Sequence, residues 1–185
     1  MTISTVAAGA VASSEPLSTV LIMVLTLAVW FDVTEQRIPN AITAGGLVSA
    51  LVLRAMIGGD ALWSGLQGGA TGLFLGVLLF AAGAMGAGDG KLLAAVGSLL
   101  GFHVFLWCLP LIGAFGGLLA LVVTIRNGTV IATLVRFRDL LFHFVTLGRL
   151  GSLRTLSTPG SVAVPYGVAV AAGAVTAWLG WGLSL

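Results

Sequence analysis

Charged side chains are scarce in this sequence. Only 8% of its 185 residues are charged and 58% are hydrophobic, whereas an average soluble domain carries about 25% charged residues. So few charges cannot cover a surface that faces water, which excludes an ordinary soluble domain. The apolar runs have the length of helices rather than that of the alternating strands of a barrel. The composition therefore predicts an all-α membrane protein.

Cysteine is nearly absent as well. The single Cys108 lies in an apolar run, which excludes a disulfide framework or a cysteine-based zinc site within this chain. The net charge is only +2, so nothing indicates a nucleic-acid partner, and we expect neither a metal nor a cofactor. No basic region precedes the first apolar run, and a cleaved signal peptide is therefore not expected. We interpret residues 1–15 as an N-terminal tail and residues 16–185 as one membrane domain.

Six apolar stretches approach the roughly 20 residues that a helix needs to cross a bilayer. The predicted spans are Leu17–Phe31, Ala41–Ile57, Leu62–Met85, Leu92–Trp107, Leu111–Ile125 and Val162–Leu183. Pro110 is expected to mark the turn between the fourth and fifth spans, which places His103 inside the fourth. The third span carries Gly68, Gly72 and Gly76 at four-residue spacing, a pattern that lets helix backbones approach closely.

The segment between the fifth and sixth spans, residues 126–160, has a different character. Polar residues recur there every three or four positions, at Thr129, Thr133, Arg136, Asp139, His143 and Thr146. This period predicts a basic amphipathic helix that lies in the headgroup plane. A helix packed against the cytoplasmic ends of the bundle is an equally open alternative.

The basic residues predict the orientation of the six spans. Seven of the eight Lys and Arg residues fall in loops on one side, and the positive-inside rule makes that side cytoplasmic. Both termini then lie on the extracytoplasmic side. The exception, Arg54, stands near the outer end of the second span, where we expect it to extend outward toward Asp60.

Two carboxylates are predicted to meet at the cytoplasmic face. Asp32 ends the first span and Asp89 precedes the fourth, so the chain crosses the membrane twice between them and returns to the same side. Two close carboxylates can share one proton and activate water to hydrolyse a peptide bond. Gly86 and Gly88, next to Asp89, would let an extended substrate approach the backbone.

Other interpretations of these acids remain open. Each aspartate could simply cap a helix at the membrane interface, where a carboxylate near a helix N-terminus is favourable. The pair could also serve a small ion- or proton-coupled transporter, although such sites usually lie near the bilayer midplane. A presenilin-like enzyme is a third alternative. Glu35 is interpreted as a solvated loop charge, with a third acid that contacts a basic substrate segment as the alternative. Lys91 could tune the pKa of Asp89, pair with a substrate carboxylate or anchor the chain at the membrane.

Two motifs resemble those of the prepilin peptidase family, the GxGD aspartic proteases. The first is the pattern D-x5-I-P-N from Asp32 to Asn40, and the second is the run Gly86-Ala87-Gly88-Asp89-Gly90-Lys91-Leu92. Val164-Pro165-Tyr166-Gly167 is a third and weaker match. The resemblance implies that Asp32 and Asp89 are the catalytic pair. It also assigns supporting roles to six motif residues: Gly86, Gly88, Lys91, Arg37, Pro39 and Asn40.

The same resemblance implies a substrate and a location. Members of this family remove the short basic leader of type IV pilin-like precursors at the cytoplasmic face of a prokaryotic inner membrane. The implied partners are thus a prepilin-like protein, the lipid bilayer and the pilus assembly machinery. The chain lacks a region with paired Cys-x-x-Cys motifs, so no methyltransferase activity is expected. It looks like the short, protease-only members that serve tight-adherence (Flp) pili, or like archaeal preflagellin peptidases.

Overall fold

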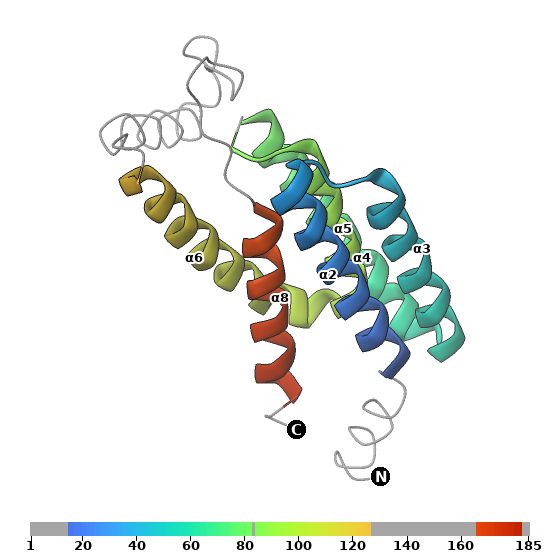
Figure 1. Ribbon diagram of the computed structural model, residues 1–185. Helices are drawn as coiled ribbons and strands as arrows, with labels where there is room; N and C mark the ends of the chain where they lie inside the picture. Colours follow the sequence, from blue (N-terminus) through green and yellow to red (C-terminus); the bar gives the residue numbers. More distant parts are fainter. Residues whose placement is uncertain (1–14, 83, 127–165, 183–185) are drawn as a thin grey trace.

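The computed structural model describes residues 15–82, 84–126 and 166–182, and every regular element in these ranges is a helix (Figure 1). The helices are α2 (Glu15–Glu35), α3 (Asn40–Ile57), α4 (Gly59–Ala81), α5 (Ala87–Leu100), α6 (Phe102–Arg126) and α8 (Tyr166–Gly182). Most of the predicted tail and the whole amphipathic segment after Arg126 lie outside the described residues, so those interpretations stay predictions.

Four helices of the described ranges, α2, α3, α4 and α6, are long and apolar enough to cross a membrane, and α8 is a shorter apolar helix. These helices confirm the prediction of an all-α membrane protein. The remaining helix, α5, has 14 residues, fewer than a full span needs. It contacts all the other described helices, and each residue from Leu92 to Leu100 is buried. Because α5 is surrounded by protein, it can be short.

The predicted boundary between the fourth and fifth spans is wrong. The chain turns at Gly101 rather than at Pro110, and α6 runs through Pro110 without ending. Gly101 has a φ of 78°, and a side chain there would meet the guanidinium of Arg54 at 2.7 Å. A backbone break at membrane depth is tolerated where protein surrounds it, and a membrane helix tolerates a proline inside it. His103 consequently lies in the first turn of α6, exposed and edge-on to the Phe102 ring.

The glycine ladder of α4 packs directly against the backbone of α5. An added Cβ at Gly76 would lie 2.5 Å from the Cα of Gly90, and one at Gly72 would meet the backbone of Leu93. Gly68 contacts the Gly97 carbonyl in the same way. The predicted close packing is confirmed, and it fixes α5 against α4.

Replacing Gly72 by Leu is expected to destabilise the protein, because its side chain would separate the α4 and α5 backbones. The expected loss is about 1–3 kcal/mol or more, typical of overpacking. The buried Cys108 provides the measurement, since a thiol-reactive dye labels it only on unfolding. Gly45→Leu is the matched control, because nothing lies within 4 Å of an added Cβ at Gly45. Equal melting temperatures for the two variants would contradict the packing argument.

Arg54 does not extend outward, contrary to the prediction. It is buried, with 9% of its surface exposed, and its guanidinium donates to the carbonyls of Ser98 (2.6 Å), Leu99 (3.0 Å) and Ala61 (3.1 Å). The last carbonyls of a helix have no partner within the helix. Arg54 donates hydrogen bonds to these carbonyls at the end of α5. These bonds outweigh the hydration that the guanidinium would gain by extending toward water.

Arg54→Met is expected to lower the free energy of unfolding by at least about 2 kcal/mol, because hydrogen bonds to a charged group each contribute about 1.5–3 kcal/mol. The same Cys108 labelling assay measures it. Arg126→Met, at an exposed arginine in the last turn of α6, serves as the control and should unfold like the unmodified protein. An Arg54→Met variant as stable as this control would refute the capping role.

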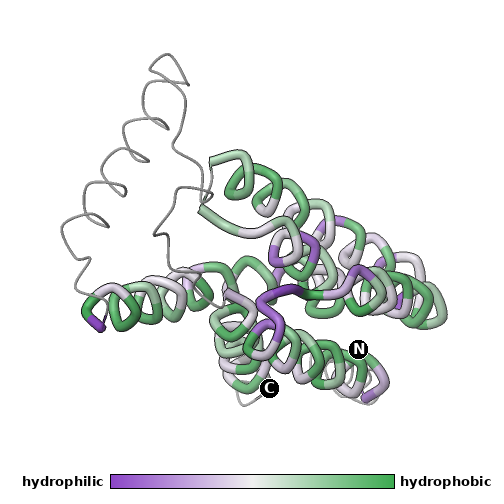
Figure 2. Tube along the Cα trace, turned by 45° about the horizontal axis from the view of Figure 1, so that its top comes forward, coloured by the Kyte–Doolittle hydropathy of each residue, from purple (hydrophilic) through white to green (hydrophobic). Residues whose placement is uncertain are grey.

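Helix ends gather at one end of the bundle, at the top of Figure 1. There α2 ends, α3 begins, α5 begins and α8 begins. Viewed more directly from this end, the connection between α2 and α3 is hydrophilic, while the flanks of the helices are mostly hydrophobic (Figure 2). Gln36 ends α2 with a left-handed φ of 52°. We refer to this end as the polar end, and both predicted aspartates belong to it.

Candidate active site

Asp32 stands in the last turn of α2 and is buried, with 6% of its surface exposed. Its Oδ2 accepts a hydrogen bond of 2.7 Å from the backbone N–H of Gly167. Gly167 lies in the first turn of α8, where the N–H groups have no acceptor within the helix and the helix dipole favours negative charge. The start of α8 therefore fixes the orientation of the Asp32 carboxylate.

Asp89 stands in the first turn of α5, outside the four candidate spans. Its Oδ2 accepts a 3.2 Å hydrogen bond from the N–H of Gly86, the residue that caps the helix. Burial, and second the negative charge of Asp32, raise the pKa of Asp89 to about 6, although the Gly86 hydrogen bond opposes the shift. The two carboxylates are thus close enough for the charge of one to affect the titration of the other.

The raised pKa of Asp89 predicts a pH-dependent cost in stability. Its folded pKa of about 6 exceeds the usual 3.9 or so, so the folded state binds more protons between these values. Stability should then fall as pH rises from about 4 to about 6, and stay lowered above that. Asp89→Asn removes this cost, at most about 3 kcal/mol. Its melting temperature should exceed that of the unmodified protein at pH 8 but match it near pH 4.

Tryptophan fluorescence during thermal unfolding at both pH values makes this comparison. Asp60→Asn is the control, since Asp60 is exposed in the first turn of α4. If Asp89→Asn and the unmodified protein had equal melting temperatures at every pH, the raised pKa of Asp89 would be refuted.

The comparison with known families decides the identity of the chain. Residues 19–136 match the type IV leader peptidase family, and this stretch contains both aspartates and both motifs. The chain belongs to the type IV leader peptidase family. No curated protein and no solved structure matches it. Membership implies a protease that acts on prepilin leaders, as the resemblance of the motifs predicts.

The two motifs of this leader peptidase lie side by side at the polar end. Lys91 Nζ donates a 2.8 Å hydrogen bond to Asn40 Oδ1, which links the start of α5 to the start of α3. Gly88 packs on Ile38, where an added Cβ would lie 3.4 Å from the isoleucine Cβ. These contacts hold the I-P-N segment next to Asp89.

Pro39 and Arg37 have different places in the same connection. Pro39 has φ −59° and ψ 136° and directly precedes α3, and the fixed φ of proline suits the opening of a helix. Arg37 is exposed, and so is Glu35, the neighbouring acid. The two charges are therefore available to a ligand that approaches from water.

The start of α8 contributes more to the site than the sequence predicts. The Val164-Pro165-Tyr166-Gly167 match indicated that this segment matters, but not that Gly167 would bind Asp32. An added Cβ at Gly167 would lie 2.7 Å from Asp32 Oδ2, so a side chain there would displace the Asp32 carboxylate. Tyr166 is half-buried, packs near Gly116, and lies close enough to Asp89 to sense its charge. Both residues lie beyond the stretch that matches the leader peptidase family.

Within the described ranges no group of three or more His, Cys, Asp or Glu side chains could hold a metal ion. The chemistry that the described residues offer is that of two coupled carboxylates beside glycine backbone. Such a pair can hold and transfer protons to and from water and a substrate.

Proposed function

We propose that this chain is an aspartic endopeptidase that removes the basic leader of type IV pilin-like precursors with Asp32 and Asp89. The placement of both aspartates at the polar end, where each carboxylate is held by a backbone N–H at the start of a helix, is the observation that carries the proposal, together with membership of the leader peptidase family. Each carboxylate also accepts an N–H at a helix start, Asp32 at α8 and Asp89 at α5, so capping orients the pair, and the catalytic role rests on the family match that contains both residues.

The proposed reaction needs one proton on the pair. The ionised carboxylate accepts a proton from a water molecule as that water attacks the scissile carbonyl carbon. The protonated carboxylate donates a hydrogen bond to the carbonyl oxygen, where negative charge develops. The tetrahedral intermediate then collapses, and the carboxyl group that took the proton delivers it to the leaving amine. The Asp89 pKa of about 6 supports a proton held on the pair up to about pH 6.

The glycines beside Asp89 suit an extended substrate. Gly86 is extended, with φ −73° and ψ 154°, and it has no side chain to keep a peptide from the Asp89 carboxylate. Lys91 and Asn40 hold the neighbouring loop in place through their hydrogen bond. We assign these residues, with Gly88, Pro39 and Arg37, positioning roles around the scissile bond.

The proposed site faces the cytoplasm of a prokaryotic cell, in the inner membrane, in a chain of six spans with both termini outside. The position of Asp32 and Asp89 at the same end of the bundle supports this topology, since two helices separate them (Figure 1). A reporter that is active only outside the cytoplasm, fused after Ile57, should be active. The same reporter fused after Gln36 should be inactive.

Flp-type prepilins are the substrates that we propose, with no methylation of the new N-terminus. The first proposal rests on the resemblance to the short, protease-only members, and the second rests on the lack of paired Cys-x-x-Cys motifs in this sequence. Co-expression with an Flp-type prepilin and mass measurement of the product tests them together. The expected product lacks the leader and carries no added methyl group. An intact precursor would refute the peptidase proposal, and a methylated product would refute only the second.

A further inference from the structure

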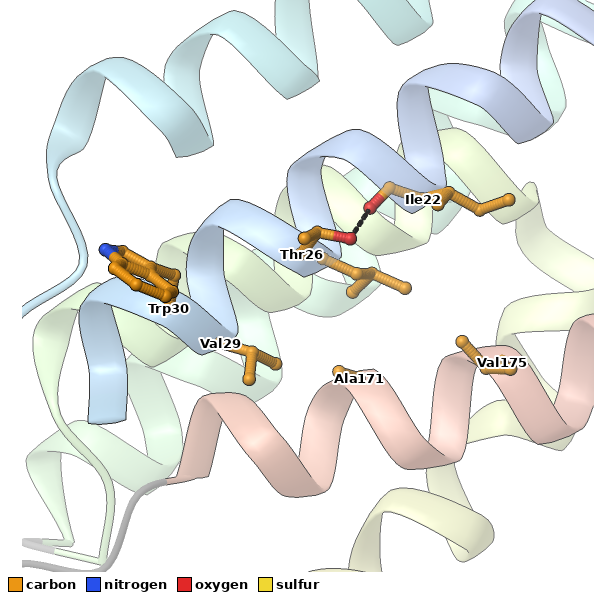
Figure 3. A pocket seen from close by; sticks show the side chains of 7 residues that line it. Ile22, Thr26, Val29, Trp30, Ala171 and Val175 are labelled. Atoms are coloured by element: carbon orange, nitrogen blue, oxygen red, sulfur yellow. Dashed lines mark hydrogen bonds between the residues drawn. The ribbon is translucent and has the colours of Figure 1, made fainter. Parts of the chain in front are cut away.

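An open groove runs between α2 and α8, below the polar end (Figure 3). It has a volume of about 370 Å³, and its walls are five residues of α2 between Ile22 and Trp30 together with Ala171 and Val175 of α8. The hydroxyl of Thr26 donates to the Ile22 carbonyl at 2.7 Å. The polar group of Thr26 is therefore satisfied within α2, and the α2/α8 groove presents an apolar surface.

The α2/α8 groove leads to the proposed catalytic pair. Trp30, at one end, precedes Asp32 by two residues in α2, and Ala171 follows Gly167 by one helical turn in α8. The hydrogen bond between Gly167 and Asp32 thus joins α8 to α2 at the end of the groove nearest the polar end. From Ile22 to Trp30 the helix rises about 12 Å, or roughly two turns.

The apolar lining of this groove suits an apolar occupant, and the groove lies next to the start of α8, which holds Asp32. We propose that the occupant is the apolar helix of the precursor, which enters sideways from the lipid and lies along α2 and α8. This inference rests on the proposed function and on the family resemblance, which implies that the leader is cut directly before the hydrophobic N-terminal helix of the mature subunit. A helix seated between Ile22 and Trp30 places its N-terminal end beside Asp32. The basic leader then continues past Asp32 toward the exposed carboxylate of Glu35.

A second groove, on the other flank of α8, lacks this connection. It is smaller, about 200 Å³, and lies between α6 and α8 with Ala172 and Val168 in its lining. No acidic residue occurs in α6, so neither wall carries a catalytic carboxylate. The α6/α8 groove therefore offers a control, because Ala171 and Ala172 are consecutive and both half-buried, one in each groove.

Filling the groove tests the inference. Ala171→Trp should raise the KM for a full-length Flp-type prepilin at least tenfold. The same variant should change kcat/KM less than twofold for a short water-soluble peptide that spans the leader and the scissile bond. Ala172→Trp should leave both values within twofold of the unmodified enzyme. Equal losses on both substrates, or equal effects of the two variants, would overturn the groove assignment.

A photo-reactive phenylalanine analogue identifies the occupant directly. Placed at position 171 in an Asp89→Asn background, it should form a covalent adduct with the prepilin, whereas position 172 should not. An adduct only with a second copy of this chain, or only with lipid, would overturn the proposal. If the unmodified enzyme cuts neither substrate, the peptidase function fails and the inference with it. If it cuts both and Ala171→Trp behaves like Ala172→Trp, the groove inference alone fails.

Discussion

Replacing either Asp32 or Asp89 by Asn is expected to lower the rate of leader removal by at least about 1,000-fold. Proton transfer by a positioned side chain contributes about 10²–10⁴-fold, and neither variant can share a proton between two carboxylates. The amide of Asn has nearly the shape of the carboxylic acid, and its oxygen can still accept the N–H of Gly86 or Gly167. The fold should therefore survive, and the loss should appear in kcat.

The measurement is the rate at which purified protein in detergent converts an Flp-type prepilin to its mature form. Asp60→Asn is the matched control, because Asp60 is exposed at the opposite end of the bundle, where α4 begins (Figure 1). This control should retain full activity. Substantial processing by Asp89→Asn would exclude the two-carboxylate mechanism, and so would an equal loss in Asp60→Asn.

Gly167→Ala is expected to reduce kcat by about 100-fold with little loss of stability. Its methyl group would lie 2.7 Å from Oδ2 and 3.1 Å from Cβ of Asp32, so the carboxylate must move away from the start of α8. A displacement of about 1 Å in a reacting group can lower a rate by about 10²-fold. Rates with prepilin and melting temperatures of the same preparations separate the effect on catalysis from that on folding.

Gly180→Ala provides the control for this substitution, since it lies in the same helix with nothing within 4 Å of an added Cβ. It should be as active and as stable as the unmodified protein. A Gly167→Ala variant that keeps more than a third of the activity would show that the contact with α8 does not position Asp32.

The site could be predicted from the sequence to the extent that it depends on order along the chain. Asp32 and Asp89 lie at the same end because two helices separate them, and counting apolar runs suffices for that. The contact between the I-P-N segment and Gly88 could only be inferred from the resemblance of the motifs. The role of Gly167 could not be found this way, because 135 positions separate it from Asp32.

The turn between α5 and α6 illustrates the same limit for the fold. Pro110 and Gly101 are both signals for a break, and nothing local ranks them. The structure places the turn at Gly101, where a left-handed φ is allowed and where Arg54, from another helix, binds the free carbonyls of α5. The prediction that Arg54 extends outward was wrong for the same reason, because the carbonyls that it binds are distant in the chain.

The sequence by itself determined that this protein is helical and belongs in a membrane, because apolar length is a local property that each helix carries alone. It also determined both motifs and the relative side of the two aspartates. Only the tertiary structure decided which backbone atoms hold the carboxylates, where α5 ends, and that α2 and α8 leave a groove open beside Asp32. Each of these depends on the close approach of helices distant in the chain, and local pattern does not specify such contacts.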